Sequence, residues 1–205
     1  MHEVFSNLIG NIKFEGTIET DAINLLNYYG CSSISEHSVK VANEARRLAN
    51  RFGANEHHAS IAGYLHDISG IIPDTEKIDV CNKLGIDVLA EERIVPGLLH
   101  SKISRFMAAE IFNISELAIL SAIECHSTLK PNATVVDMIL FIADKLQWDS
   151  IHNACFIEDV KAGLEISLEH GAFAYLQYLY NHRQKMKVYH PWASEAYTDL
   201  QMKCK

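Results

Sequence analysis

Apolar residues recur at intervals of three and four along most of this 205-residue chain, and no other feature limits its fold so strongly. The interval matches one face of an α-helix, in which a turn takes about 3.6 residues. The stretch ISEHSVKVANEARRLANRFG, residues 34–53, is typical, and Gly53 predicts where its helix ends. The predicted inward face is formed by His37, Val41, Ala45, Leu48 and Phe52.

The same pattern predicts further helices at residues 56–67, 75–84, 100–112, 115–126, 134–148 and 159–186. Residues 134–148 are apolar nearly all round, so we expect a central helix that its neighbours bury. Residues 159–186 are predicted as one long helix with a weak point at Gly171. No alternating stretch competes with these helices. The sequence therefore predicts an all-α bundle of about seven or more helices.

Composition narrows the classes of partner and the compartment. A chain that is 48% hydrophobic and 21% charged can bury one core, and its formal net charge of −8 without a basic run argues against a nucleic-acid polymer. There is no basic start followed by an apolar core and no run of about 18 apolar residues, so neither export nor membrane insertion is expected. Five scattered cysteines without a Cys-x-x-Cys pair predict reduced thiols and a cytoplasmic location.

Six polar side chains lie at the ends or edges of the predicted apolar stripes, where an unsatisfied polar group is costly. They are His37, His66, Asp67, His100, His126 and Asp144. Each alone has an ordinary structural explanation, because a core histidine can bond a backbone carbonyl and a buried Asp can cap a helix or pair with Arg. One shared divalent cation would satisfy all six at once, and we prefer this interpretation for the set.

The adjacent residues His66 and Asp67 come directly before Ser69 and Gly70, where the predicted helix runs out. Neighbours on a helix point about 100° apart, but a final turn allows the chain to bring both toward one ion. Imidazole and carboxylate ligands without cysteine favour iron, manganese or zinc over calcium and magnesium. Six ligands exceed what one tetrahedral zinc needs, and they suffice for two ions if Asp67 bridges both.

The order of these six residues on helices of an all-α domain resembles the HD superfamily of metal-dependent phosphohydrolases, and the two middle histidines resemble its two-metal members. Six segments resemble, in order and spacing, the bacterial symmetrical diadenosine-tetraphosphate hydrolases of that superfamily. The segments are EHSVKVANEARRLANRFGA, AGYLHDIS, LLHSKISRFMAAEIF, AIECHS, MILFIADKL and YHPWASEAYTDL. The resemblance covers about residues 18–200, which leaves residues 1–17 as an N-terminal extension.

The resemblance implies one or two metal ions per chain, typically iron in this family, with manganese and zinc as alternatives. The first ion would be bound by His37, His66, Asp67 and Asp144. His100 and His126 would complete a second metal site or contact the phosphates, so the catalytic residues implied are Asp67, His100 and His126. The substrate contacts implied are His100, His126, Ser127, Lys145 and Tyr197.

Three positions depart from the family pattern. Gly70 stands where the family has a lysine, three residues after the His-Asp pair. The turn LQWDS, residues 146–150, lacks the family's arginine, and Tyr197 and Thr198 replace an Arg-Asn pair in the tail. A charged hydrogen bond is worth roughly 1.5–3 kcal/mol, so the losses predict weaker or redirected activity on diadenosine tetraphosphate.

Other side chains could compensate in part. Four cationic residues could supply charge, although a solvated helix face is the usual place for such residues. They are Lys102, Arg105, Lys130 and Lys145. Trp148 and Trp192 could stack on a base, or pack in the core.

Three functions remain open from the sequence. The first is a phosphohydrolase that cleaves a dinucleoside polyphosphate, by resemblance diadenosine tetraphosphate to two ADP. The second applies the same chemistry, as a phosphatase or phosphodiesterase, to another small phosphate ester such as a nucleoside monophosphate. The third is a non-catalytic regulatory domain that holds a metal and a ligand. The complete set of predicted ligands favours an enzyme. The partners expected are a small phosphorylated ligand, preferably a nucleotide, and a second copy of the chain if it forms a homodimer.

Overall fold

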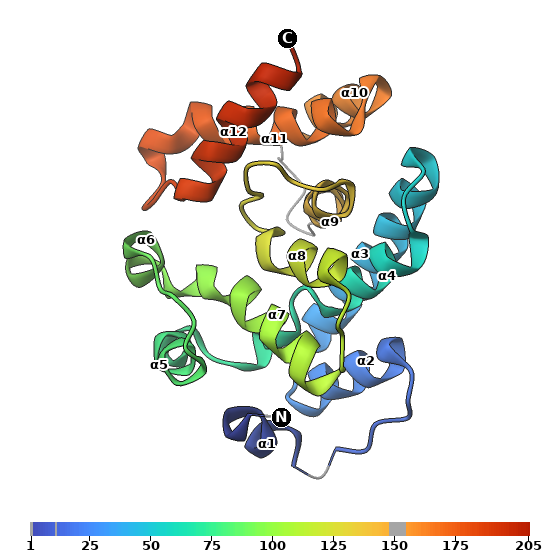
Figure 1. Cartoon of the computed structure of the whole chain (residues 1–205), viewed down its shortest axis with the longest axis vertical. Helices are drawn as coiled ribbons and strands as arrows, with labels where there is room; N and C mark the ends of the chain where they lie inside the picture. The colour runs from blue at the N-terminus through green and yellow to red at the C-terminus, as the bar shows by residue number, and fades with distance from the viewer. Residues whose placement is uncertain (1, 11, 148–154) are drawn as a thin grey trace.

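The protein is helical throughout the part of the chain that the computed structural model describes, residues 2–10, 12–147 and 155–205 (Figure 1). The helices are α1 (Glu3–Ile9), α2 (Ile18–Tyr28), α3 (Ser32–Phe52), α4 (Glu56–Leu65), α5 (Asp74–Leu84), α6 (Ala90–Ile94), α7 (His100–Ile111), α8 (Leu117–Cys125), α9 (Val135–Leu146), α10 (Ile157–Ile166), α11 (Leu168–His182) and α12 (Pro191–Lys203). Short 3-10 turns are η1 (Ile68–Ile71), η2 (Pro96–Leu99) and η4 (Arg183–Lys185). These elements confirm the predicted all-α bundle.

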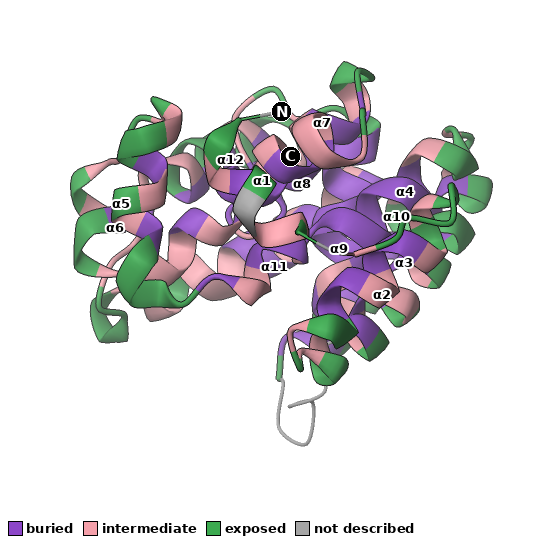
Figure 2. Ribbon diagram, turned by 90° about the horizontal axis from the view of Figure 1, so that it is seen from below, coloured by how far each residue is buried: buried purple, intermediate pink, exposed green. Residues whose placement is uncertain are grey.

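Helix α9 is the centre of the bundle, as its apolar sequence predicts. It contacts α3, α4, α8, α10 and α11, and nine of its residues, from Val136 to Lys145, are buried. Thr134 caps its start, since the threonine hydroxyl accepts from the Asp137 amide while the Asp137 carboxylate accepts from the Thr134 amide. Figure 2 shows the buried residues gathered on α9, α4 and α8. Asp144, near the end of α9, is thereby placed beside the other core helices.

Helices α3 and α4 form a hairpin whose backbones touch. A Cβ atom on Gly63 would lie 2.7 Å from the backbone nitrogen of Ala42, closer than side-chain atoms approach, so only glycine permits this spacing. Gly53 ends α3 in the left-handed conformation, at φ 70°, as predicted. The tight hairpin brings the start of α3 and the end of α4 together, and with them His37 and His66.

The prediction of one long helix over 159–186 is wrong. The chain breaks at Ser167, whose backbone is extended, and continues as α11 in a new direction. The physical reason is a helix N-cap: the Ser167 hydroxyl accepts from the His170 amide, 3.3 Å away. Gly171, the predicted weak point, lies inside α11 and provides room for Leu164. Ser167 is a residue type that favours a helix start, but the apolar period continues across it, so the spacing alone did not reveal the break.

The first residues pack onto the bundle. Phe5 of α1 is fully buried, α1 contacts α5 and α7, and the Tyr29 hydroxyl donates to the Leu8 carbonyl at 2.6 Å. Helices α1, α2, α6 and α12 were not distinguished by apolar periodicity. The boundary of the domain at residue 18 stays a prediction.

The described helices include none that is long and apolar enough to cross a bilayer. All five cysteines are free, which agrees with the expectation that no disulfide framework is present.

Substituting Ser167→Ala should lower the free energy of unfolding by about 1 kcal/mol, because an N-cap hydroxyl is lost at the α10–α11 corner. Urea denaturation checks the value. The matched control is Ser194→Ala, an exposed position within α12, which should change stability by less than about 0.5 kcal/mol. Equal effects of the two substitutions would remove the cap as the cause of the break.

Candidate metal centre

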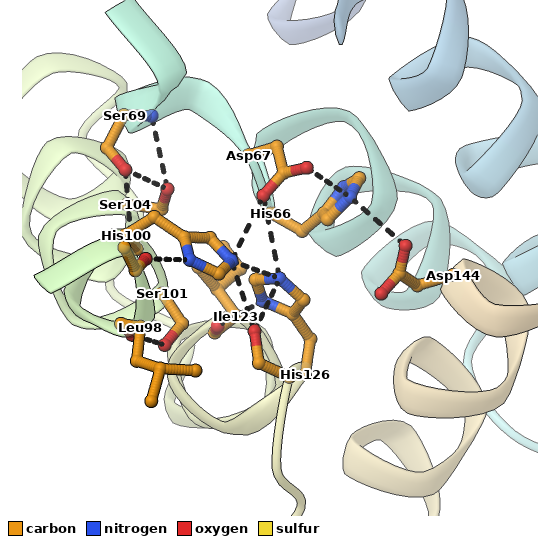
Figure 3. A network of polar contacts seen from close by, with 12 residues as sticks. His66, Asp67, Ser69, Leu98, His100, Ser101, Ser104, Ile123, His126 and Asp144 are labelled. Carbon is orange, nitrogen blue, oxygen red and sulfur yellow. Dashed lines mark hydrogen bonds and ion pairs between the residues drawn. The ribbon is translucent and has the colours of Figure 1, made fainter. Parts of the chain in front are cut away.

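The six polar residues that the sequence singles out lie together at one place in the bundle. Figure 3 labels all of them except His37. His37 comes from the first turns of α3, and Asp144 from the last turn of α9. Helix α4 ends directly before His66 and Asp67, α7 begins at His100, and α8 ends directly before His126. Ends of four helices and the side of a fifth, α3, therefore build the cluster.

Asp67 lies in the middle. Its Oδ2 is 3.3 Å from His66 Nε2, and its Oδ1 is 3.3 Å from His100 Nε2 and 3.6 Å from His126 Nε2. Two groups of donor atoms share this carboxylate, and within each group all atoms lie within 4.8 Å of one another. The groups are His37, His66 and Asp67, and Asp67, His100 and His126.

Asp144 completes the first side of the cluster. Its Oδ1 lies 3.0 Å from His37 Nε2 and 3.8 Å from His66 Nε2. Four donors from three segments of the chain thus face one another on this side. A single ion with bonds of about 2 Å could take all four after small rotations of the side chains.

Three of the histidines are oriented in the same way. The Nδ1 atoms of His66, His100 and His126 lie 2.8, 2.6 and 2.8 Å from the carbonyl oxygens of Gly63, Gly97 and Ile123, respectively. Each carbonyl belongs to the residue three positions earlier, in the last turn of a helical segment, where carbonyls lack partners within the helix. A carbonyl only accepts, so each Nδ1 carries a proton, and the Nε2 atom of each ring is turned toward the centre.

Protein groups provide few hydrogen-bond partners for these Nε2 atoms. His66 Nε2 is buried without a hydrogen bond, although the two carboxylates lie nearby. The Nε2 atoms of His100 and His126 are 3.0 Å apart, and the Ser127 hydroxyl, at 3.0 and 3.2 Å, can donate to one of them only. Facing lone pairs repel unless a cation or a proton lies between them. The donor set therefore fits a metal ion.

Electrostatics lead to the same conclusion. Burial lowers the pKa of the His66 imidazole, but the Asp67 and Asp144 carboxylates outweigh it and raise that pKa to about 9, so near neutral pH a proton stays on Nε2 until a cation replaces it. Burial opposes ionisation of Asp67 and Asp144, yet surrounding cationic groups hold the pKa of both carboxyls well below the usual value. Burial lowers the pKa of His126 to about 4. Two carboxylates thus stay charged and attract a cation, while His126 keeps its lone pair free near neutral pH.

Hydrogen bonds from two serines hold the backbone of His100 in place. The Ser69 hydroxyl donates to the His100 carbonyl at 2.7 Å, and the Ser104 hydroxyl accepts from the Ser69 amide at 3.1 Å and bonds its hydroxyl at 3.0 Å. Sequence reasoning did not identify Ser69 or Ser104. Their signal was present in part, because Ser69 follows the His-Asp pair and Ser104 lies one turn after His100.

The cluster opens into a cavity of about 540 Å³. Ser127, Lys145, Leu98 and Tyr175 are among the residues that line it with the histidines and carboxylates. Lys145 is buried and pairs with Asp144, which contradicts the expectation of a solvated helix face for this lysine. Burial would lower the Lys145 pKa, but Asp144 outweighs it and raises the pKa, so the side chain is cationic.

Other predicted residues do not reach the cavity. Tyr197 is buried in an aromatic stack, 4.3 Å from the ring of Tyr180 and nearly parallel to it. Lys102 is buried too, not solvated, and pairs with Glu92 at 2.8 Å. Trp192 packs against the core, with Lys102 over its ring.

The two remaining cationic candidates bond to neighbouring helices, Arg105 to Glu124 at 3.7 Å and Lys130 to Ser121 at 2.8 Å. Trp148 lies outside the described residues.

Comparisons with known proteins agree with this geometry. A family model described as HD domain matches residues 34–149. An uncharacterized protein in the pepC 5′ region of Lactococcus lactis subsp. cremoris is 43% identical over 143 residues, which cover 70% of this chain and 72% of that protein. The symmetrical bis(5′-nucleosyl)-tetraphosphatase of Bacillus subtilis is 29% identical over 113 residues, 54% of this chain and 59% of that enzyme.

A solved structure shares the fold. It is described as a predicted HD superfamily hydrolase involved in NAD metabolism from Clostridium acetobutylicum. Its TM-score is 0.80 at 24% sequence identity, with 90% of this chain and 96% of that chain covered. The likeness confirms the helical architecture along most of the chain.

A divalent metal should stabilise the folded protein, because the native cluster binds it and the unfolded chain does not. At a concentration 100 times the dissociation constant we expect a gain of about 2.7 kcal/mol, seen as a higher Tm that chelation reverses. His126→Ala should reduce this gain, whereas His57→Ala, at an exposed histidine of α4, should preserve it. A Tm that changes neither on addition of metal nor on addition of chelator would contradict a metal centre.

Proposed function

The chain belongs to the HD domain family, and from this premise we propose that its buried cluster binds one or two metal ions and hydrolyses a phosphoric anhydride or ester bond of a nucleotide. The observation that carries the proposal is the position of Asp67 between two groups of imidazole nitrogens, of which His66 Nε2 is buried without a hydrogen-bond partner. This arrangement supports His37, His66, Asp67 and Asp144 as ligands of a first ion. It supports Asp67, His100 and His126 as ligands of a second.

A metal held there would lower the pKa of a bound water toward neutrality and neutralise charge on phosphoryl oxygens. The chain's own residues orient the ligand side chains and bind the phosphate oxygens. The carbonyls of Gly63, Gly97 and Ile123 lock three imidazoles in one tautomer. Lys145, in the wall of the cavity, offers a charged donor for a phosphate oxygen. The Ser127 hydroxyl, beside His100 and His126, offers a second donor.

Iron is our first choice of metal, with manganese and zinc as alternatives, because the donors are imidazole and carboxylate without thiolate. A cytoplasmic location goes with this proposal, since all five cysteines are free.

For the substrate we propose a nucleotide polyphosphate used with lower efficiency than by the symmetrical tetraphosphatases. The similarity to the Bacillus subtilis enzyme supports nucleotide chemistry. The environment of Gly70 supports the lower efficiency, because Ile34 fills the space that a side chain at Gly70 would enter, and Ile34 also lines the cavity. An apolar group thus stands where the related enzymes place a lysine.

Replacing Asp67 by Ala should remove metal and lower hydrolysis at least about 100-fold, because both groups of donors lose their common carboxylate. Metal content by elemental analysis and turnover of a panel of dinucleotides, mononucleotides and an aryl phosphate measure the effect. Asp159→Ala, at an exposed aspartate of α10, should leave both values unchanged. Full turnover in the Asp67→Ala protein with metal still bound would overturn the proposal.

The double substitution Ile34→Ala and Gly70→Lys should raise kcat/KM for diadenosine tetraphosphate about tenfold, because it makes room for a cation beside the phosphates. Ile34→Ala alone is the control and should not raise it. Activity on 4-nitrophenyl phosphate should change less than threefold in either protein. If the natural protein already cleaves the dinucleotide efficiently and the double variant gains nothing, Gly70 does not limit the choice of substrate. Tyr197 is unsuitable for such a test, because an arginine there would break the aromatic stack.

A further inference from the structure

A second cavity, of about 360 Å³, lies between α11 and the segment 186–190 that leads to α12. Its walls are mostly apolar, and they include Val95, Leu98, Leu179, Val188 and Ala193. The volume falls within the range of about 300–1,000 Å³ that is common for small-molecule sites.

This cavity adjoins the cluster of histidines and carboxylates. Leu98, Ser127 and Tyr175 line both cavities, so a molecule can extend from one to the other past these three side chains. The two cavities differ in chemistry. One holds carboxylates, imidazoles and Lys145, whereas the other holds aliphatic and tyrosine side chains. A ligand that fits both has a charged end and an apolar or aromatic end.

The segment 186–190 adds hydrogen-bonding capacity to the apolar cavity. Its ends are extended, with ψ 148° at Met186 and 137° at His190. Within the described residues, the backbone amides and carbonyls of Lys187, Val188 and Tyr189 take part in no hydrogen bond to another backbone group. Such groups in the wall of a cavity can pair with the donors and acceptors on the edge of a heteroaromatic ring.

The segment is held in place from its far end. His190 caps α12, as its Nδ1 accepts from the Trp192 amide at 3.2 Å, so Nε2 carries the proton. That nitrogen lies 3.5 Å from the buried carboxylate of Glu92, which also bonds Lys102 at 2.8 Å. A network that joins α6, α7 and α12 therefore fixes the wall before any ligand arrives, which lowers the cost of ordering it on binding.

We propose that the cavity between α11 and segment 186–190 is a nucleobase site, in which Leu98 and Leu179 contact the faces of the base and the main chain of Lys187–Tyr189 pairs with its edge. The proposal rests on the proposed function and deepens it, since it places the phosphates of the same ligand at the metal centre. A heteroaromatic base suits this cavity better than a plain alkyl chain, which would leave the backbone groups without partners. The substrate class is then a nucleotide whose base contributes to binding.

Binding measurements test the proposal without requiring turnover. The manganese-loaded full chain is titrated with the α,β-methylene diphosphates of adenosine, guanosine, cytidine and uridine, and with methylenediphosphonate, which has the same phosphonate but no nucleoside. At least one nucleotide analogue should bind tenfold or more tightly than methylenediphosphonate. Equal affinities would overturn the proposal.

Two variants that fill the cavity, Leu179→Trp and Val188→Trp, test whether the tighter binding of the nucleotide analogue depends on this cavity. Two are used so that the test remains possible if one of them does not fold. Each should abolish the advantage of the nucleotide analogue and leave the affinity for methylenediphosphonate within twofold. Met202→Trp, at an exposed position of α12, is the matched control and should keep the natural ratio. A natural ratio in both folded cavity variants would overturn the site. Absence of hydrolysis with the binding ratio intact would instead refute the proposed hydrolytic function and leave the base site supported.

Discussion

The arrangement of the core depends on one buried carboxylate, Asp67, whose charge needs polar partners. Asp67 lies among three imidazoles, and its charge is retained because positive or polarisable groups surround it. An isolated carboxylate in such a place would cost several kcal/mol. The fold meets this demand by ending α4 and α8 and beginning α7 at the same point, each with a histidine in position. The bundle is thus organised around a polar centre that its apolar helices enclose.

Helix ends make this centre possible. A histidine directly after a helix can donate a hydrogen bond from Nδ1 to a carbonyl that the helix leaves unpaired, as His66 and His126 do. The same bond satisfies the helix and fixes the direction of Nε2. A histidine within a helix, such as His37, has no such carbonyl and needs another partner, here Asp144. The residue at which each of these helices ends therefore also sets the direction in which its histidine points.

This coupling explains what the sequence could predict. Apolar spacing located α3 and α9, and His37 and Asp144 stood out because they are polar residues at the edge of those apolar faces. Spacing could not show that Ser167 divides 159–186, because both helices keep the period on either side of the cap. Nor could it place Tyr197, whose ring stacks on Tyr180 through a tertiary contact between α11 and α12. Polar residues at apolar positions of a helix were therefore predictable, whereas a cap that keeps the helical period and a stacking contact between two helices were not.

The distribution of charge around the cluster bears on the choice of ligand. The buried lysines pair with buried carboxylates, Lys145 with Asp144 and Lys102 with Glu92. A metal bound to the Asp144 carboxylate would compete with Lys145 for the same charge and would leave the ammonium group available to a phosphate oxygen. Lys102 is different, because Glu92 is no part of the cluster and holds the lysine beside the ring of Trp192. In the proposed function Lys145 would serve the phosphate end of the ligand, and Lys102, through Glu92, would help to hold His190 at the end of segment 186–190.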